Sequence, residues 1–171
     1  MDTRKLTRLA LYTTVALILS YLETLIPLAV PVPGIKLGLA NAVVLLALET
    51  LGTPAAFILT LLRIFLSGFL FGSLGSILYA LSGGLLSFLG MTLLCRIRSK
   101  LSFSLVAVSI AGALLHNLGQ LTAAALVVQN IHLFLTYLPV LMIAAIITGL
   151  VTGLVVQLLM KYLSSLQNSS S

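Results

Sequence analysis

Long apolar runs, separated by short stretches rich in proline, glycine or charge, make up almost the whole of this chain. Only 7% of its residues are charged, whereas a soluble domain carries about 25% charged residues. We therefore expect an all-α, polytopic membrane protein, with one transmembrane domain over residues 1–163 and a disordered polar tail over residues 164–171. The predicted transmembrane helices are six, over residues 6–28, 37–51, 54–70, 74–94, 104–128 and 135–161.

The basic residues indicate how this predicted bundle is oriented. Six helices place both chain ends on one side. That side carries seven of the nine basic residues, while Lys36 falls on the other side and Arg63 within the third apolar run. The seven are Arg4, Lys5, Arg8, Arg96, Arg98, Lys100 and Lys161. By the positive-inside rule, both termini are expected in the cytoplasm, so the net charge of +6 indicates membrane orientation rather than nucleic-acid binding. The first run continues to Pro27 without a cleavage pattern, which favours a retained helix over a signal peptide.

Three polar side chains interrupt the fifth apolar run, at His116, Asn117 and Gln120. In lipid, a polar group needs a protein partner because no water is present to satisfy it. In a helix His116 and Gln120 lie on one face, being four residues apart. The sequence therefore predicts a helix with one face that meets something polar.

An arginine, Arg63, falls near the centre of the third run. Such a charge at mid-bilayer costs about 2.5 kcal/mol or more on insertion scales. One interpretation is an ion pair with Glu23 or Glu49, and another is a contact with a ligand. The two interpretations are compatible.

Depths along the predicted helices bring the polar side chains into one half of the membrane. At about 1.5 Å per residue, His116 and Arg63 fall near the midplane. The others fall at or above it, towards the outside: Gln120, Asn117, Asn41, Glu23 and Lys36. The loop 27–36 contains three prolines and is a candidate lid over them. This layout predicts a binding pocket open to the outside rather than a pore. The alternative is that these groups only hydrogen-bond neighbouring helices.

The residue types argue against an enzyme. The chain has one aspartate, Asp2, so it lacks the paired carboxylates that magnesium-dependent diphosphate chemistry uses. It has no glycine-rich phosphate loop, and His116 and His132 are not at metal-ligand spacing. The single cysteine, Cys95, excludes an internal disulfide. We expect no catalytic residues, no metal and no cofactor.

Five strings resemble the Gx transporter family, also described as heptaprenyl diphosphate synthase component I, over nearly the whole chain. They are Glu23-Thr-Leu-Ile-Pro27, Pro33-Gly-Ile-Lys-Leu-Gly-Leu-Ala-Asn41, Leu62-Arg-Ile-Phe-Leu-Ser-Gly-Phe-Leu-Phe-Gly72, Leu81-Ser-Gly-Gly84 and His116-Asn-Leu-Gly-Gln120. That family is similar to the substrate-binding S components of energy-coupling factor transporters. The resemblance implies an S-component-like six-helix bundle in a bacterial plasma membrane. It also implies a transmembrane coupling subunit and two cytoplasmic ATPases as partners.

The resemblance implies a role as the substrate-binding subunit of a small-molecule uptake transporter. The predicted ligand site consists of Glu23, Lys36, Asn41, Arg63, His116, Asn117 and Gln120. Two cations against one carboxylate favour a ligand with an anionic or acceptor-rich part. S components dock through Ala-x-x-x-Ala on the first helix, where this chain has Ala10-x-x-x-Thr14 and Ala16-x-x-x-Ser20. The alternative is a non-catalytic membrane accessory of heptaprenyl diphosphate or quinone synthesis, or of a membrane redox system.

Overall fold

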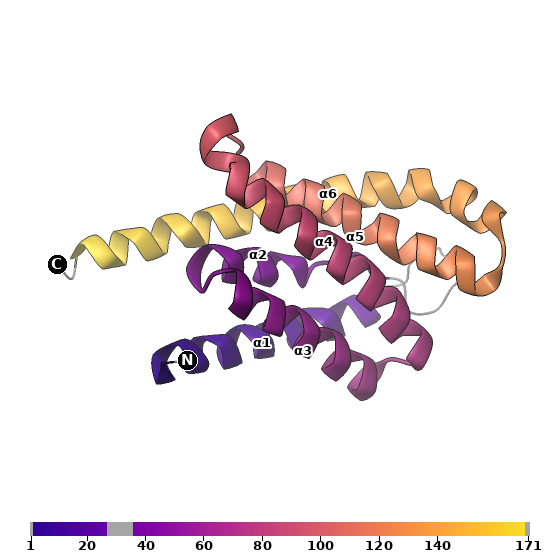
Figure 1. The fold of residues 1–171 in the computed structure, drawn as a ribbon, viewed down its shortest axis with the longest axis horizontal. Helices are drawn as coiled ribbons and strands as arrows, with labels where there is room; N and C mark the ends of the chain where they lie inside the picture. The colour runs from indigo at the N-terminus through magenta and orange to yellow at the C-terminus, as the bar shows by residue number, and fades with distance from the viewer. Residues whose placement is uncertain (1, 27–35, 170–171) are drawn as a thin grey trace.

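The computed structural model describes residues 2–26 and 36–169, and within them it contains six α-helices and no strand (Figure 1). Five of these helices are long and apolar enough to cross a membrane, which confirms a multi-pass membrane protein. The second helix has ten residues and is about 15 Å long, half the thickness of the hydrocarbon layer. The helices are α1 (Thr3–Thr24), α2 (Asn41–Thr50), α3 (Thr53–Phe71), α4 (Leu74–Leu101), α5 (Leu105–Val128) and α6 (Ile131–Ser169).

Two helices extend further than the sequence predicts. The predicted end of α4 is residue 94, but the helix continues to Leu101, and α6 continues to Ser169 instead of ending at Lys161. Hydropathy locates where a helix leaves the apolar layer, whereas lysine, arginine and leucine keep the backbone helical beyond that level. The structure therefore corrects the predicted ends of these two helices. The division into a domain over residues 1–163 and a polar tail stays a prediction.

The start of α6 also differs from the prediction. The helix begins at Ile131, so His132 lies in its first turn and not in a link between helices. Pro139 lies inside the helix rather than near its start. At the other sharp turn, Gly52 with φ +84° is the N-cap of α3, which begins at Thr53, one residue before the predicted start. Pro54 is then in the first turn of α3, as predicted, because that position needs no backbone donor.

The short helix α2 lies at the centre of the bundle. It contacts each of the other five helices, and none of its residues is exposed. By contrast, no Cα atom of α1 comes within 8 Å of one in α6, and among the described helices α1 packs against α2 and α3. A hydrophobic core surrounds α2 and includes Val44, Leu45, Leu59 and Val108. The centre of the protein is therefore built on a helix too short to cross a membrane by itself.

Close packing of α5 on α6 depends on two glycines. A Cβ atom at Gly149 would lie 2.6 Å from the Cα atom of Ile110, and one at Gly153 would lie 2.8 Å from that of Val106. The Gly-x-x-x-Gly spacing thus brings two backbones together, as in other membrane helix pairs. Both chain ends lie at the same end of the bundle, on the left in Figure 1. We call it the basic end, because Arg4, Lys5, Arg8, Arg96, Arg98 and Lys161 lie towards it.

Candidate functional site

All seven predicted site residues are buried, and none exposes more than 8% of its surface. They come from α1, the segment before α2, and from α2, α3 and α5. Burial of ionised groups costs several kcal/mol each unless hydrogen bonds and opposite charges compensate it. The partners of each group therefore decide what this part of the protein does.

Glu23 and Lys36 connect α1 to the segment that leads into α2. The Glu23 Oε1 atom accepts a hydrogen bond of 2.5 Å from the backbone N–H of Leu39. The Lys36 Nζ atom donates to the backbone oxygen of Ser20 at 3.4 Å. Burial lowers the pKa of the Lys36 ammonium, and the charge of Glu23 opposes that lowering. Lys36 exposes 8% of its surface, so it lies inside the protein.

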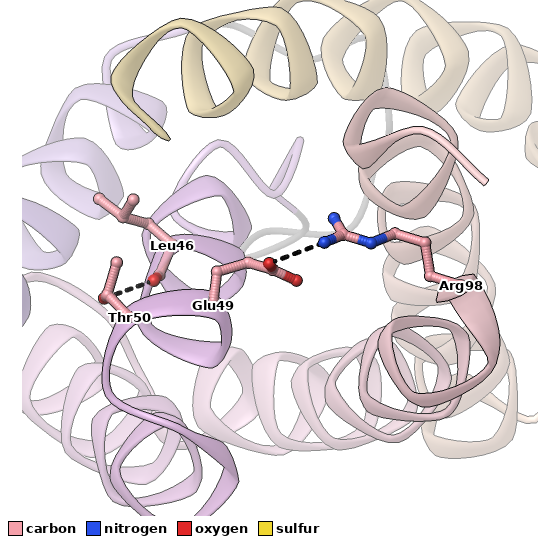
Figure 2. A network of polar contacts seen from close by, with 4 residues as sticks. All are labelled: Leu46, Glu49, Thr50 and Arg98. Atoms are coloured by element: carbon pink, nitrogen blue, oxygen red, sulfur yellow. Dashed lines mark hydrogen bonds and ion pairs between the residues drawn. The ribbon is translucent and has the colours of Figure 1, made fainter. Parts of the chain in front are cut away.

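Arg63 binds an asparagine rather than a carboxylate. Its Nη2 atom donates to Asn41 Oδ1 at 2.9 Å. Within the described residues the one ion pair joins Glu49 to Arg98, at 3.1 Å (Figure 2), so the predicted pairing of Arg63 with Glu23 or Glu49 is wrong. The reason is geometric: Arg63 lies beside Asn41 at the first turn of α2, and Glu49 is in its last turn, towards the basic end.

A chain of hydrogen bonds fixes the protonation of His116. Gln120 Oε1 accepts from the backbone N–H of Lys36 at 2.9 Å, so its Nε2 atom faces His116 Nε2 and donates to it. His116 Nε2 must then be an acceptor, which places the ring proton on Nδ1. The prediction that His116 and Gln120 share a helix face is confirmed.

Asn117 points elsewhere. Its Nδ2 atom donates to the backbone oxygen of Leu141 at 2.9 Å, so it ties α5 to α6. It lies next to His116 in sequence but on another face of the helix. The structure therefore joins Arg63 to Asn41, and Lys36 to Gln120 and His116. Glu23 binds the backbone before α2, and Asn117 links two other helices.

Five buried polar atoms of these residues have no hydrogen-bond partner among the described residues. Leaving such an atom unpaired costs about 1–3 kcal/mol, and more when it is charged. Three of the five are donors and two are acceptors. They are Arg63 Nε, Asn41 Nδ2, His116 Nδ1, Glu23 Oε2 and Asn117 Oδ1. The predicted lid falls mainly on residues 27–35, which lie outside the described part of the chain, so the lid stays a prediction.

Two glycines position these polar groups, and a pattern of polar side chains alone does not reveal them. Gly38 has φ +86°, and a Cβ there would lie 2.8 Å from Asn41 Nδ2 and 2.9 Å from His116 Cδ2. A Cβ at Gly83 of α4 would collide with the backbone oxygen of His116. Ser82 donates to the backbone oxygen of Gly119 at 2.8 Å beside this crossing. The signal was available, because Gly38 and Gly83 lie inside strings already noted for their resemblance.

Two clefts lie at the basic end, away from these polar groups. One has a volume of about 270 Å³ and is lined by Asp2, Arg4, Lys5, Arg8, Thr50 and Leu51. The other, of about 250 Å³, is lined by Leu48, Glu49, Thr53, Thr92, Cys95, Arg96 and Arg98. The sequence predicted a pocket at the opposite end and neither of these clefts. Over residues 2–26 and 36–169, no three His, Cys, Asp or Glu side chains gather as a metal site requires.

A model of the family described as heptaprenyl diphosphate synthase component I matches residues 12–159. The matched range contains all seven predicted site residues and both glycines that position them, but it starts after the basic residues of α1. No curated protein and no solved structure matches the chain.

Proposed function

This chain belongs to the heptaprenyl diphosphate synthase component I family, and from that premise we propose that it is the substrate-binding subunit of a small-molecule uptake transporter in a bacterial plasma membrane. The observation that carries the proposal is the group of buried polar side chains around α2. Side chains that served only to join helices would satisfy one another. Here four buried polar atoms of this group are left without partners among the described residues.

The unpaired atoms suggest the chemistry of the ligand. Arg63 Nε, Asn41 Nδ2 and His116 Nδ1 are donors, so a ligand with several acceptors would satisfy them. Lys36 and Arg63 against Glu23 leave an excess of one positive charge, which favours an anionic or acceptor-rich ligand. Glu23 Oε2 would in turn accept from a ligand donor.

Transport would require partners, because the chain has no glycine-rich phosphate loop for ATP. We propose a transmembrane coupling subunit with cytoplasmic ATPases as those partners. We propose binding rather than catalysis at the polar group. The one aspartate of the chain, Asp2, lies before α1, at the end of that helix opposite to Glu23, so it cannot pair with Glu23 as a second carboxylate.

The test is native mass spectrometry of the gently solubilised protein, with extraction of any co-purified small molecule. The Arg63→Gln and His116→Asn variants should lose a ligand that the wild type carries at one copy per chain. Matched controls are Arg98→Gln, which removes one arginine of the basic end, and His132→Asn, which changes an exposed histidine. Both controls should keep the ligand. A folded Arg63→Gln protein with a full complement of ligand would contradict the proposal.

The family description supports a second candidate, a non-catalytic membrane accessory of heptaprenyl diphosphate or quinone synthesis, or of a membrane redox system. The word "component" in that description favours a partner protein. Affinity purification under the same mild conditions separates the two candidates. A protein that holds no small molecule and captures a prenyl diphosphate synthase or a redox protein would favour the accessory. Capture of a coupling subunit with its ATPases would favour the transporter.

A further inference from the structure

The cleft at the start of α1 is a second candidate binding site, separate from the polar group around α2. It is bounded by the first two turns of α1 and by the turn between α2 and α3, and its volume is about 270 Å³. Arg4 and Arg8 are four residues apart and share a helix face, and Lys5 is three residues from Arg8. Three cationic side chains from consecutive turns of one helix thus line a single cleft.

The charges of this cleft are not neutralised within the described residues. Three cations line it against one carboxylate, that of Asp2, which leaves an excess of two positive charges. The one ion pair of the described chain is elsewhere, between Arg98 and Glu49. Arg4 and Lys5 also lie in the first turn of α1, where the helix dipole is positive and cations are disfavoured. An anion in the cleft would relieve both kinds of repulsion.

We propose that this cleft binds the dianionic phosphate monoester group of a membrane lipid. Two negative charges match the excess of two positive charges, whereas the phosphodiester of an ordinary phospholipid carries one. Arginine binds two phosphate oxygens at once and lysine adds a compact charge, so Arg4, Lys5 and Arg8 form a suitable set. This site is independent of the polar group around α2.

The surroundings of the cleft favour a lipid over a soluble anion. Along α1 beyond the cleft, Leu6, Leu11 and Val15 expose 54%, 60% and 41% of their surfaces. In a membrane these side chains face acyl chains, so a phosphate in the cleft would have its own hydrocarbon chains beside them. No Cα atom of α6 lies within 8 Å of one in α1, so α6 does not pack against α1. A headgroup in the cleft could therefore be reached from the surrounding lipid.

The neighbouring cleft provides an internal comparison. It also contains two arginines, Arg96 and Arg98, but Glu49 binds Arg98 at 3.1 Å (Figure 2). One excess positive charge remains there instead of two. The same end of the protein thus has two basic clefts that differ in charge. Phosphate binding is expected in the cleft at the start of α1, which has no ion pair among the described residues.

The experiment measures lipid retention on the full chain by native mass spectrometry. The protein is exchanged into mixed micelles with phosphatidic acid, a phosphate monoester with nearly two charges, or with phosphatidylglycerol, a phosphodiester with one. We expect phosphatidic acid to be retained about tenfold more strongly, because its second negative charge allows a further charge-assisted contact with the cations of the cleft. Lys5→Gln/Arg8→Gln should abolish that preference. The charge-matched control Arg96→Gln/Lys161→Gln should keep it.

The double variants remove positive charges, and such a loss could also disturb membrane insertion. A second variant avoids this problem because it removes a negative charge instead. Asp2→Asn removes the one carboxylate of the cleft and should strengthen the retention of phosphatidic acid. Equal retention of the two lipids, equal losses in the two double variants, or no response to Asp2→Asn would each overturn the proposal. Displacement of phosphatidic acid by micromolar inorganic diphosphate would assign the cleft to a soluble anion and overturn the lipid assignment. Arg63→Gln should leave lipid retention unchanged, which separates this site from the proposed transport site.

Discussion

At the scale of single residues, backbone atoms complete the polar group. The carboxylate of Glu23 binds the N–H of Leu39, and the amide of Gln120 binds the N–H of Lys36. Both N–H groups belong to the segment that Gly38 bends, and Gly38 adopts φ +86°. The backbone before α2 therefore carries part of the candidate site, and its shape depends on a residue without a side chain.

We predict that Gly38→Ala destroys the candidate site, whereas Gly52→Ala does not. Both residues have a positive φ, +86° and +84°, that side chains with a Cβ rarely adopt, so both variants pay a backbone cost of about 1–3 kcal/mol. Only the Cβ at position 38 meets other atoms, because nothing lies within 4 Å of a Cβ at Gly52. Gly38→Ala should therefore lose more thermal stability in detergent, and it should lose the co-purified ligand. Equal losses of stability and ligand in the two variants would show that contact with the polar group is not the reason for a glycine at position 38.

All seven site residues could be selected from the sequence because a polar side chain in an apolar run must be paired in lipid. Their burial agrees with that reasoning. Their hydrogen-bond partners could not be predicted from the sequence. Leu39, Ser20 and Leu141 contribute backbone atoms, which every residue has, so no pattern of side chains identifies them. The predicted ion pair of Arg63 was wrong for a related reason. A sequence suggests ion pairs between its carboxylates and its cations. In the structure the partner of Arg63 is instead the amide oxygen of Asn41.

At the scale of helices, α4 and α5 cross with their backbones in contact. A Cβ at Gly119 would lie 2.8 Å from the Cα atom of Gly83 and 2.9 Å from the backbone oxygen of Ser82. This crossing lies beside His116 and Gln120, so the distance between the two helices sets the geometry of those side chains. The close approach depends on glycine at both positions, because a side chain at either one would push the two backbones apart.

We predict that Gly119→Ala separates α4 from α5 and breaks the hydrogen bond from Ser82 to the oxygen of Gly119. Neither opposing atom belongs to a flexible side chain, so the helices themselves must move. A matched control is Gly75→Ala in the first turn of α4, where a Cβ meets nothing closer than 3.8 Å. That control should be neutral or stabilising by up to about 1 kcal/mol, the usual helical gain of alanine over glycine. Thermal unfolding in detergent measures both, and an equally stable Gly119→Ala protein would show that the crossing tolerates a methyl group.

At the scale of the whole molecule, the two kinds of polar chemistry lie at different ends. The buried side chains of the candidate site gather from the middle of α3 and α5 towards the end of α1 and the start of α2. The unneutralised cations gather at the basic end, where both chain ends lie (Figure 1). Five elements contribute to the candidate site and only α2 contacts every other helix. The short helix is thus the part through which a ligand would be sensed by the rest of the bundle.

The same asymmetry predicts the orientation of the protein in the membrane. By the positive-inside rule the basic end faces the cytoplasm, and the turn between α5 and α6 faces outward. In a Cys95→Ala background, we expect a membrane-impermeant maleimide to label Asn130→Cys in intact cells. Ser164→Cys, near the other end of α6, should be labelled only after the cells are permeabilised. Both positions are exposed, so access to the reagent rather than burial decides the result. Labelling in the opposite order would place the candidate site on the cytoplasmic side and contradict uptake from outside.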